Sequence, residues 1–388
     1  MTTVLISGAL ANRYLNGGAA WTRLNWILGL RQLGFKVCFV EQIRRESCVD
    51  SRGACVTFEL SENLKYFKTV TDQFDLGGSV ALVCEGGRET YGLAYRDLLD
   101  RAESAAFLLN ISGHLTLEAV MRRVKSKVYV DLDPGFTQFW HAAGNHGARL
   151  ANHDYYYTVG ENIGRATCSI PTCGIAWRPI RQPVVLKHWP VGPADDPTRF
   201  TTVASWRGAY GPVDHRSGRF GVKLHEFRKF LPLPQRVRAS FEIALDIHAA
   251  DENDRAQLTD HGWRLVDPRA TVPDPTSFWR YVQASGAECS AAQGIYVETN
   301  SGWFSDRTVR YLAAGKPALV QDTGFTLNIP AGEGLVPFRT LDEAVQGAES
   351  ILRDYDLHSR KARELAETYF DSDKVLGKLI DGIATSSI

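Results

Sequence analysis

The sequence predicts an α/β protein made of two Rossmann-like domains that face each other across a crevice. The chain has 388 residues, more than one ordinary hydrophobic core accommodates. Strand-like and helix-like segments alternate in residues 1–180 and again in residues 199–388, a pattern typical of parallel sheets covered by helices. Six prolines lie between residues 171 and 197 and interrupt both helices and sheet ladders. We therefore expect a linker at residues 181–198 between the two domains.

The first strand, turn and helix form the start of the N-terminal domain. Residues 3–7 have the pattern of a buried strand, and Gly17 and Gly18 precede an amphipathic helix. Residues 36–41 supply the next strand, which completes a βαβ unit. The glycine spacing is neither that of a dinucleotide-binding motif nor that of a P-loop. The two glycines therefore either let a phosphate or sugar approach the backbone or serve the turn alone.

Two later strands of this domain end in polar residues. The strands are expected at 105–110 and 127–131, and they are followed by His114 and by Asp133 respectively. Carboxyl ends of parallel strands share one edge of a sheet, so both side chains are candidates for the crevice. His114 is a catalytic base, a group that positions an acceptor, or a surface histidine. Asp133 is a catalytic carboxylate or a turn residue before Pro-Gly. Further segments complete the domain: strands at 79–84 and 154–159 and a helix at 91–102.

The second domain repeats the alternation and places cations near its first strand. The first strand is expected at 199–204 and a helix at 223–230, with further strands at 240–245 and 263–266. Arg207 follows the first strand, and Lys223 begins the helix. Converging cations suit a diphosphate, whereas solvated surface positions are the alternative for both residues.

Residues 301–324 predict a loop, a helix and a strand that together hold a phosphate. Ser305 is a good N-cap, Gly315 ends the helix, and residues 318–320 form a short buried strand. Arg307 adds positive charge near the start of the helix. The polar turn after the strand is expected to bind ligand, and it consists of Gln321, Asp322, Thr323 and Gly324. A plain structural unit with solvated arginines is the alternative, and beyond it we expect three closing helices and no further strand.

Composition excludes several classes of protein. Lysine plus arginine and aspartate plus glutamate are each 44, so no global field recruits nucleic acid or an anionic membrane. The seven cysteines are an odd number and suit reduced thiols in a cytoplasm. No Cys/His box indicates a metal, and no apolar run approaches the about 18 residues of a membrane span.

The segment GWFSDRTVRYLAAGKPALVQDTGF, with two α/β halves and a proline-rich linker, resembles the GT-B fold of nucleotide-sugar glycosyltransferases. It looks like a bacterial branch related to retaining glycosyltransferase family 4, whose donor-site motif is Glu-x7-Glu-Ala-x-Ala-x-Gly-x-Pro. Gly315 and Pro317 match the end of that motif, but Gly302 and Arg310 stand where it has its two glutamates. Gly17-Gly18 resembles the Gly-Gly loop of the family, and Arg207 with Lys223 resembles the cation pair that neutralises the diphosphate.

The resemblance implies glycosyl transfer from a nucleoside diphosphate sugar with retention of configuration. The N-terminal domain would bind a small-molecule acceptor, in specialised, antibiotic-type metabolism, and the C-terminal domain would bind the donor through Arg207, Lys223, Arg307 and the helix start at Ser305. An inverting enzyme would instead need a base such as His114 or Asp133. No metal, other cofactor or nucleic-acid partner is expected. A nucleotide-sugar epimerase or hydrolase, or a non-catalytic nucleotide-sugar-binding protein, is the alternative.

Overall fold

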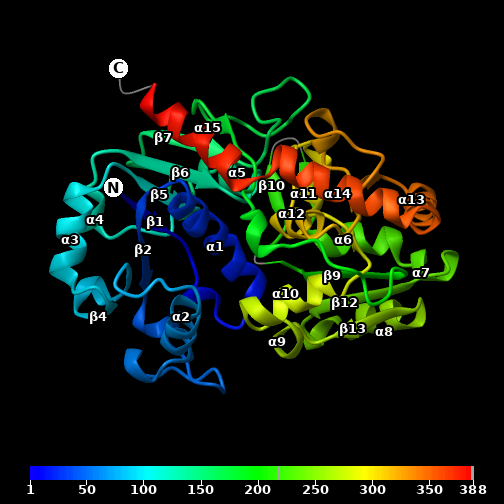
Figure 1. Ribbon diagram of the computed structural model, residues 1–388, viewed down its shortest axis with the longest axis horizontal. Helices are drawn as coiled ribbons and strands as arrows, with labels where there is room; N and C mark the ends of the chain where they lie inside the picture. The colour runs from blue at the N-terminus through cyan, green and yellow to red at the C-terminus, as the bar shows by residue number, and fades with distance from the viewer. Residues whose placement is uncertain (209, 216–217, 386–388) are drawn as a thin grey trace.

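The computed structural model describes residues 1–208, 210–215 and 218–385, and it contains two large sheets that lie side by side (Figure 1). The N-terminal sheet has the order β4-β3-β2-β1-β5-β6-β7-β8, and only β4 runs antiparallel to its neighbour. The C-terminal sheet has the order β13-β12-β9-β14-β15-β16 and is parallel throughout. The fold is therefore two Rossmann-like α/β domains, as the sequence predicts.

The N-terminal sheet consists of β1 (Thr3–Ser7), β2 (Lys36–Ile43), β3 (Val80–Cys84), β4 (Glu89–Gly92), β5 (Leu108–Ile111), β6 (Lys127–Asp131), β7 (Tyr155–Thr158) and β8 (Arg178–Pro179). Its helices are α1 (Gly17–Gln32), α2 (Glu62–Gln73), α3 (Tyr95–Ser104), α4 (Glu118–Met121) and α5 (Phe136–Ala142).

The C-terminal sheet consists of β9 (Arg199–Ser205), β12 (Ser240–Asp246), β13 (Trp263–Val266), β14 (Ala287–Ser290), β15 (Ala318–Gln321) and β16 (Leu335–Phe338), beside the hairpin of β10 (Val213–His215) and β11 (Gly218–Phe220). The helices that follow are α6 (Lys223–Phe227), α7 (Leu233–Arg236), α8 (Glu252–Asp260), α9 (Pro268–Thr271), α10 (Pro275–Gln283), α11 (Gly294–Glu298), α12 (Asp306–Ala313), α13 (Leu341–Arg353), α14 (Tyr355–Tyr369) and α15 (Ser372–Ala384).

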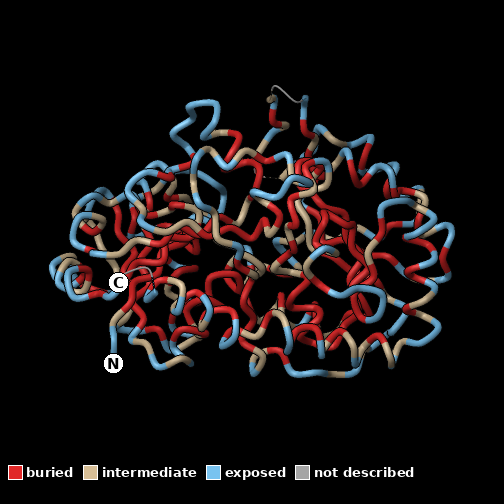
Figure 2. The backbone as a smooth tube through the Cα atoms, turned by 90° about the horizontal axis from the view of Figure 1, so that it is seen from above, coloured by how far each residue is buried: buried red, intermediate tan, exposed pale blue. Residues whose placement is uncertain are grey.

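Both sheets bury side chains on both faces. In β1, Val4 and Ile6 belong to one hydrophobic cluster with α1 and α2, whereas Leu5 belongs to another with α3 and α4. In β15, Leu319 likewise points to the opposite face from Val320. This alternation with period two is what a strand between two helical layers requires. Figure 2 accordingly shows buried backbone through the middle of both halves and exposed segments at the periphery.

Several expected elements differ from those observed. The helix expected at 91–102 begins at Tyr95, because residues 89–92 pair with β3 as the antiparallel strand β4. The expectation of no strand beyond Gly324 is wrong, because β16 pairs with β15. Its sequence, Leu-Val-Pro-Phe, contains a proline, and β16 lies at the edge of the sheet, where a missing backbone donor is tolerated.

The last helix returns to the N-terminal half of the molecule (Figure 1). α15 packs on α1, where a Cβ added to Gly29 would lie 2.6 Å from the Leu376 side chain. The expected linker holds the fully buried Val184 and Trp189, and the Val184 amide donates to the Phe370 carbonyl. The first part of this segment is therefore packed on the protein, whereas most of residues 190–198 are exposed. The boundaries 1–180, 181–198 and 199–388 stay a prediction.

The two halves contact each other through the first turns of α1. The Gly17 amide donates to the Val272 carbonyl at 3.0 Å, and the Trp21 indole donates to the Pro275 carbonyl at 2.8 Å. Arg310 on α12 donates to the Gly18 carbonyl and lies over the Phe278 ring. These bonds hold the carboxyl ends of β1 and β9 on either side of one cleft.

Within the described ranges, no helix combines the length and apolar character that a bilayer crossing requires. The cytoplasmic location stays a prediction.

Candidate active site in the cleft between the domains

A cleft of about 540 Å³ separates the carboxyl ends of the two sheets. Its N-terminal wall comes from the segments after β1, β5 and β6 and from α1, and it includes Arg13, Arg23, Ser112, His114 and Asp133. Its C-terminal wall comes from the end of β9, from Tyr210 and from α12, and it includes Val203, Ser205, Tyr210, Asp306 and Arg307. Ligands of open α/β sheets bind at such carboxyl ends, beside the point where strand order reverses. That point lies between β1 and β5 in one sheet and between β9 and β14 in the other.

Arg307 is the predicted donor residue that the structure places in the cleft wall. Its Nε donates to Glu288 at 2.5 Å and its Nη1 to the Val203 carbonyl at 2.8 Å. The side chain is 11% exposed. Desolvation lowers the pKa of Arg307, but the charge and hydrogen bond of the buried Glu288 raise it, and the net shift is upward. Arg307 is therefore a permanently charged group with a fixed orientation at the cleft.

Lys223 adjoins Arg307 and has no counter-ion of its own. The residue is buried, and in the part of the chain that the structure describes no hydrogen bond or ion pair reaches its ammonium group. Burial, and then the charge of Arg307, lower the pKa of Lys223 to about 7, although Glu288 and Asp306 oppose this shift. Two cations near one carboxylate leave an excess of positive charge, which suits an anionic ligand.

The two candidate catalytic residues, His114 and Asp133, both line the cleft. Burial, and then the charges of Arg23, Arg149 and Arg13, lower the pKa of His114 to about 3. Burial and the neighbouring Asp131 raise the pKa of Asp133 to about 6, and the Tyr296 hydroxyl donates to its carboxylate at 3.2 Å. A base works best when its pKa is near the working pH, so this geometry favours Asp133 over His114 for proton handling.

A buried carboxylate shapes the N-terminal wall. Glu41 on β2 accepts hydrogen bonds from the backbone amides of Leu10, Ala11 and Asn12, and a fourth from the Asn12 side chain. These bonds fix the backbone just before Arg13, which lines the cleft. Burial raises the pKa of Glu41.

Gly17 and Gly18 act in domain packing in this structure. A Cβ on Gly17 would lie 2.1 Å from the Asp274 carbonyl oxygen, and one on Gly18 would lie 3.1 Å from the Phe278 ring. Gly18 also lines the cleft, whereas Gly17 is buried against α10. Their proposed contact with the donor stays a prediction, and close approach of two helices already explains why both positions lack a side chain.

Arg207 lies apart from the cation pair. Its Nε and Nη2 form a two-pronged ion pair with Asp251, and its side chain is 56% exposed. It does not line the cleft. Lys223 is likewise not among the residues that line the cleft, but it interacts electrostatically with Arg307, which does line it. The donor-binding role of Arg207 stays a prediction.

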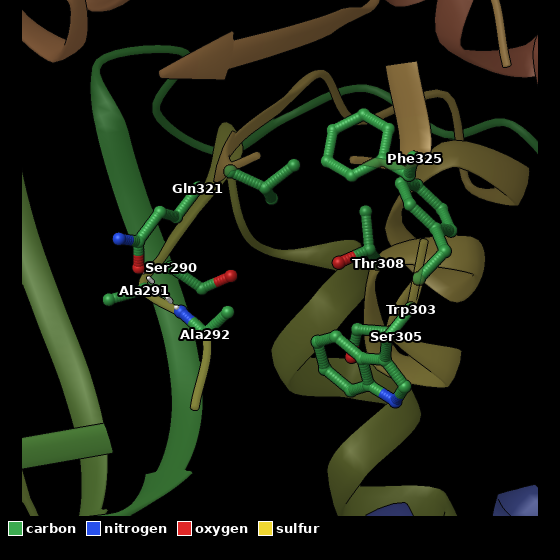
Figure 3. A pocket seen from close by; sticks show the side chains of 10 residues that line it. Ser290, Ala291, Ala292, Trp303, Ser305, Thr308, Gln321 and Phe325 are labelled. Atoms are coloured by element: carbon green, nitrogen blue, oxygen red, sulfur yellow. Dashed lines mark hydrogen bonds between the residues drawn. The ribbon is translucent and has the colours of Figure 1, made fainter. Parts of the chain in front are cut away.

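Ser305 caps α12 as predicted, since its hydroxyl accepts from the Arg307 amide at 3.2 Å. Its side chain faces a small cavity of about 10 Å³ behind the helix (Figure 3). Gln321 faces the same cavity and accepts from the Ala292 amide. A space of this size holds no nucleotide. Ser305 does not line the cleft, and its donor-binding role stays a prediction.

The predicted turn after β15 is held by internal bonds. Asp322 accepts from the Gly324 amide, from Thr326 and from Arg339. The Thr323 hydroxyl donates to the Trp303 carbonyl, and the carbonyl of Gly324, at φ +89°, accepts from Asn162. None of the three residues lines the cleft. Their donor-binding role stays a prediction.

Sequence reasoning missed the two arginines of the N-terminal wall, Arg13 and Arg23. Arg23 is the only charged residue in the mostly buried stretch Ala-Ala-Trp-Thr-Arg-Leu-Asn-Trp of α1. A charge in the first turns of a helix, among residues that are buried nearly all round, is the signal that points to Arg23. The described residues contain no group of three or more His, Cys, Asp or Glu side chains able to hold a metal, and independence from metals and cofactors stays a prediction.

No model of a known protein family matches the sequence, and no curated protein matches it. Solved structures do match. An alpha-glucosyltransferase (AGT) in complex with UDP is 12% identical, with a TM-score of 0.60 over 99% of this chain and 100% of that one. HepE of Anabaena in complex with UDP-glucose is 10% identical, with a TM-score of 0.61 over 99% and 100%. Sucrose-phosphate synthase of Thermosynechococcus elongatus is 12% identical, with a TM-score of 0.56 over the full length of both chains.

These proteins are glycosyltransferases of the GT-B architecture, and the present chain has that fold. The narrower relation to family 4 stays a prediction.

The expectation of a small-molecule acceptor and no nucleic acid is wrong. The alpha-glucosyltransferase of this fold is also solved with UDP and a 13-mer DNA that contains an HMU base, at a TM-score of 0.61 and 11% identity. A net charge of zero is no ground to exclude nucleic acid, because a local cluster of positive charge can attract a polyanion without a global excess.

Proposed function

We propose that the protein transfers a glycosyl group from a nucleoside diphosphate sugar, with the diphosphate at Arg307 and Lys223. The observation that carries the proposal is the excess of positive charge around Glu288 at the C-terminal wall of a cleft large enough for a ligand. The neighbours in complex with UDP or UDP-glucose support UDP-sugars as the first donors to test.

In the proposed reaction, the bond between the anomeric carbon and the diphosphate oxygen breaks, and a bond to the acceptor oxygen forms. Arg307 and Lys223 stabilise the charge that develops on the leaving diphosphate. Retention of configuration, which the family 4 resemblance implies, remains part of the proposal. The acceptor proton then passes to the leaving diphosphate, while Asp133 accepts a hydrogen bond from the acceptor hydroxyl and orients it.

We further propose a nucleic-acid acceptor, supported by the DNA complexes of the neighbour and by exposed arginines at the cleft. Arg13 and Arg269 are both exposed and both line the cleft, so they are placed to meet a polyanion. A role in specialised metabolism stays a prediction that the fold does not test.

The test is a transfer assay with radiolabelled UDP-glucose, an oligonucleotide with a hydroxymethyl base, and the matched unmodified oligonucleotide. We expect label to enter the modified oligonucleotide, and the anomeric configuration of the product to be retained. Release of free glucose at the same rate with and without DNA would contradict the acceptor. Failure of UDP and every common nucleoside diphosphate to bind the folded protein would contradict the donor.

A further inference from the structure

Arg23 is a buried cation without a counter-ion. Its side chain lines the cleft, and the residue is only 9% exposed. Nη1 donates to the Ala19 carbonyl at 3.2 Å, and Nε is buried with no partner. In the described part of the chain, no carboxylate forms an ion pair with it. Burial, and then the charge of Arg13, lower the pKa of Arg23 to about 10.

The acidic groups that act on Arg23 are already engaged elsewhere. Asp306 pairs with Arg310 at 2.7 Å and accepts from Thr22. Glu41 accepts hydrogen bonds from the backbone amides of residues 10–12, and Asp133 accepts one from the Tyr296 hydroxyl. A buried charge without a partner is costly, and the usual compensation is an ion pair or a bound ion.

Arg13 increases the excess of charge. It is exposed, lines the same cleft, and acts electrostatically on Arg23, His114 and Asp133. Glu41 fixes the backbone just before Arg13, and both arginines line the N-terminal wall. Arg13 and Arg23 belong to the N-terminal wall of the cleft, whereas Arg307 belongs to the C-terminal wall.

We propose that Arg13 and Arg23 bind a phosphate group of the acceptor and so place its hydroxyl beside Asp133. This inference rests on the proposed function and adds the chemistry by which the acceptor is recognised. Guanidinium groups match phosphate oxygens in geometry and charge, and a fully desolvated one binds phosphate more strongly than a solvated one.

The experiment titrates inorganic phosphate and, separately, an oligonucleotide into protein saturated with UDP, which occupies the opposite wall. The variant is Arg23→Met, which keeps the length of the side chain and removes its charge. The matched control is Arg31→Met, on the same helix but exposed and bonded to the Phe74 and Asp75 carbonyls. We expect Arg23→Met to lose at least about tenfold in phosphate affinity while UDP affinity stays the same, and Arg31→Met to lose neither.

Stability separates this role from a structural one. Removal of an uncompensated buried charge is expected to leave the melting temperature of the free protein unchanged or to raise it. A structural arginine would instead lower it. In turnover, the acceptor KM of Arg23→Met should rise while the donor KM does not, and Arg23→Lys should recover part of the loss.

The two anions identify the source of the phosphate. Competition between oligonucleotide and phosphate for the wild type indicates a nucleic-acid phosphodiester, whereas binding of phosphate alone indicates a phosphate monoester. Equal phosphate affinity of wild type and Arg23→Met would overturn the inference and leave the donor proposal intact. No UDP binding to the folded wild type would overturn the donor proposal itself.

Discussion

The two walls of the cleft carry the same kind of charge but balance it differently. At the C-terminal wall, Arg307 is paired with Glu288, and Lys223 supplies the excess. At the N-terminal wall, neither Arg13 nor Arg23 has a carboxylate partner among the described residues. A paired cation is held in place before the ligand arrives, whereas an unpaired buried cation costs stability until a ligand neutralises it. The difference predicts that removing the paired Arg307 lowers stability, whereas removing the unpaired Arg23 does not.

The largest effect is expected for Arg307→Met. It removes the partner of the fully buried Glu288, whose Oε2 already has no hydrogen bond. We expect the free energy of unfolding, measured with urea, to fall by about 3–5 kcal/mol, the usual cost of breaking a buried ion pair. Turnover should be lost as well.

The double variant Arg307→Met with Glu288→Met is the control for this prediction. It removes both charges, so stability should recover while turnover should not. Recovered turnover in the double variant would show that Arg307 acts only as a structural partner of Glu288.

Lys223→Met should lower kcat/KM about 100-fold to 1000-fold, the scale for one strong electrostatic donor to a transition state. Stability should not fall. The pKa of Lys223 is lowered from 10.5 in the unfolded chain to about 7 in the folded protein, so its protonation costs stability, in full below about pH 7. That cost decreases as the pH rises towards 10.5. A variant that loses stability and keeps its turnover would contradict this role.

Asp133 should give the activity an acid limb. Its pKa is raised to about 6, so Asp133 becomes protonated as the pH falls through that value. It then no longer accepts a hydrogen bond from the hydroxyl of the acceptor substrate. We expect kcat/KM of the wild type to fall below about pH 6, and the much weaker activity of Asp133→Asn to lack this limb. An unchanged acid limb in Asp133→Asn would assign the titration to another group.

The smallest effect is expected for Arg207→Ala. The Arg207 side chain is 56% exposed and lies away from the cleft, so solvent screens its ion pair with Asp251. Turnover and melting temperature should both stay near those of the wild type. A loss as large as that of Lys223→Met would return Arg207 to the donor site.

The sequence predicted the elements whose signals are local. The cap at Ser305, the helix after it and β15 follow from a capping residue, helical spacing and a C-terminal glycine. The positions of His114, Asp133 and Arg307 at the cleft also follow from local signals, because each follows a strand end or begins a helix, and the roles proposed for them stay predictions. Two further features depend on how the C-terminal helices and the segments beside them pack. They are the proximity of Lys223 to Arg307 and the ion pair of Arg207 with Asp251. Chain order carries no such information.

The strand β16 and the burial of Arg23 at the cleft were not predicted, for related reasons. The proline in β16 lowers the strand signal of an edge strand. The burial of Arg23 depends on the packing of α1 against the C-terminal half. Gly17 and Gly18 were recognised as sites of close approach, but the group that approaches them is α10.

Calorimetric titration of UDP-glucose, in buffers of different ionisation enthalpy, tests the donor site most directly. Both phosphates of this ligand stay ionised across neutral pH, so any proton taken up on binding belongs to the protein. Lys223, with a pKa of about 7 before binding, should take up a proton from the buffer when the diphosphate binds, because the anion favours its charged form. We expect proton uptake near neutral pH and an affinity that is full below about pH 7 and falls as the pH rises, with both features absent in Lys223→Met. Binding with the same proton uptake and pH dependence in wild type and variant would contradict the assignment of the diphosphate to Lys223 and Arg307.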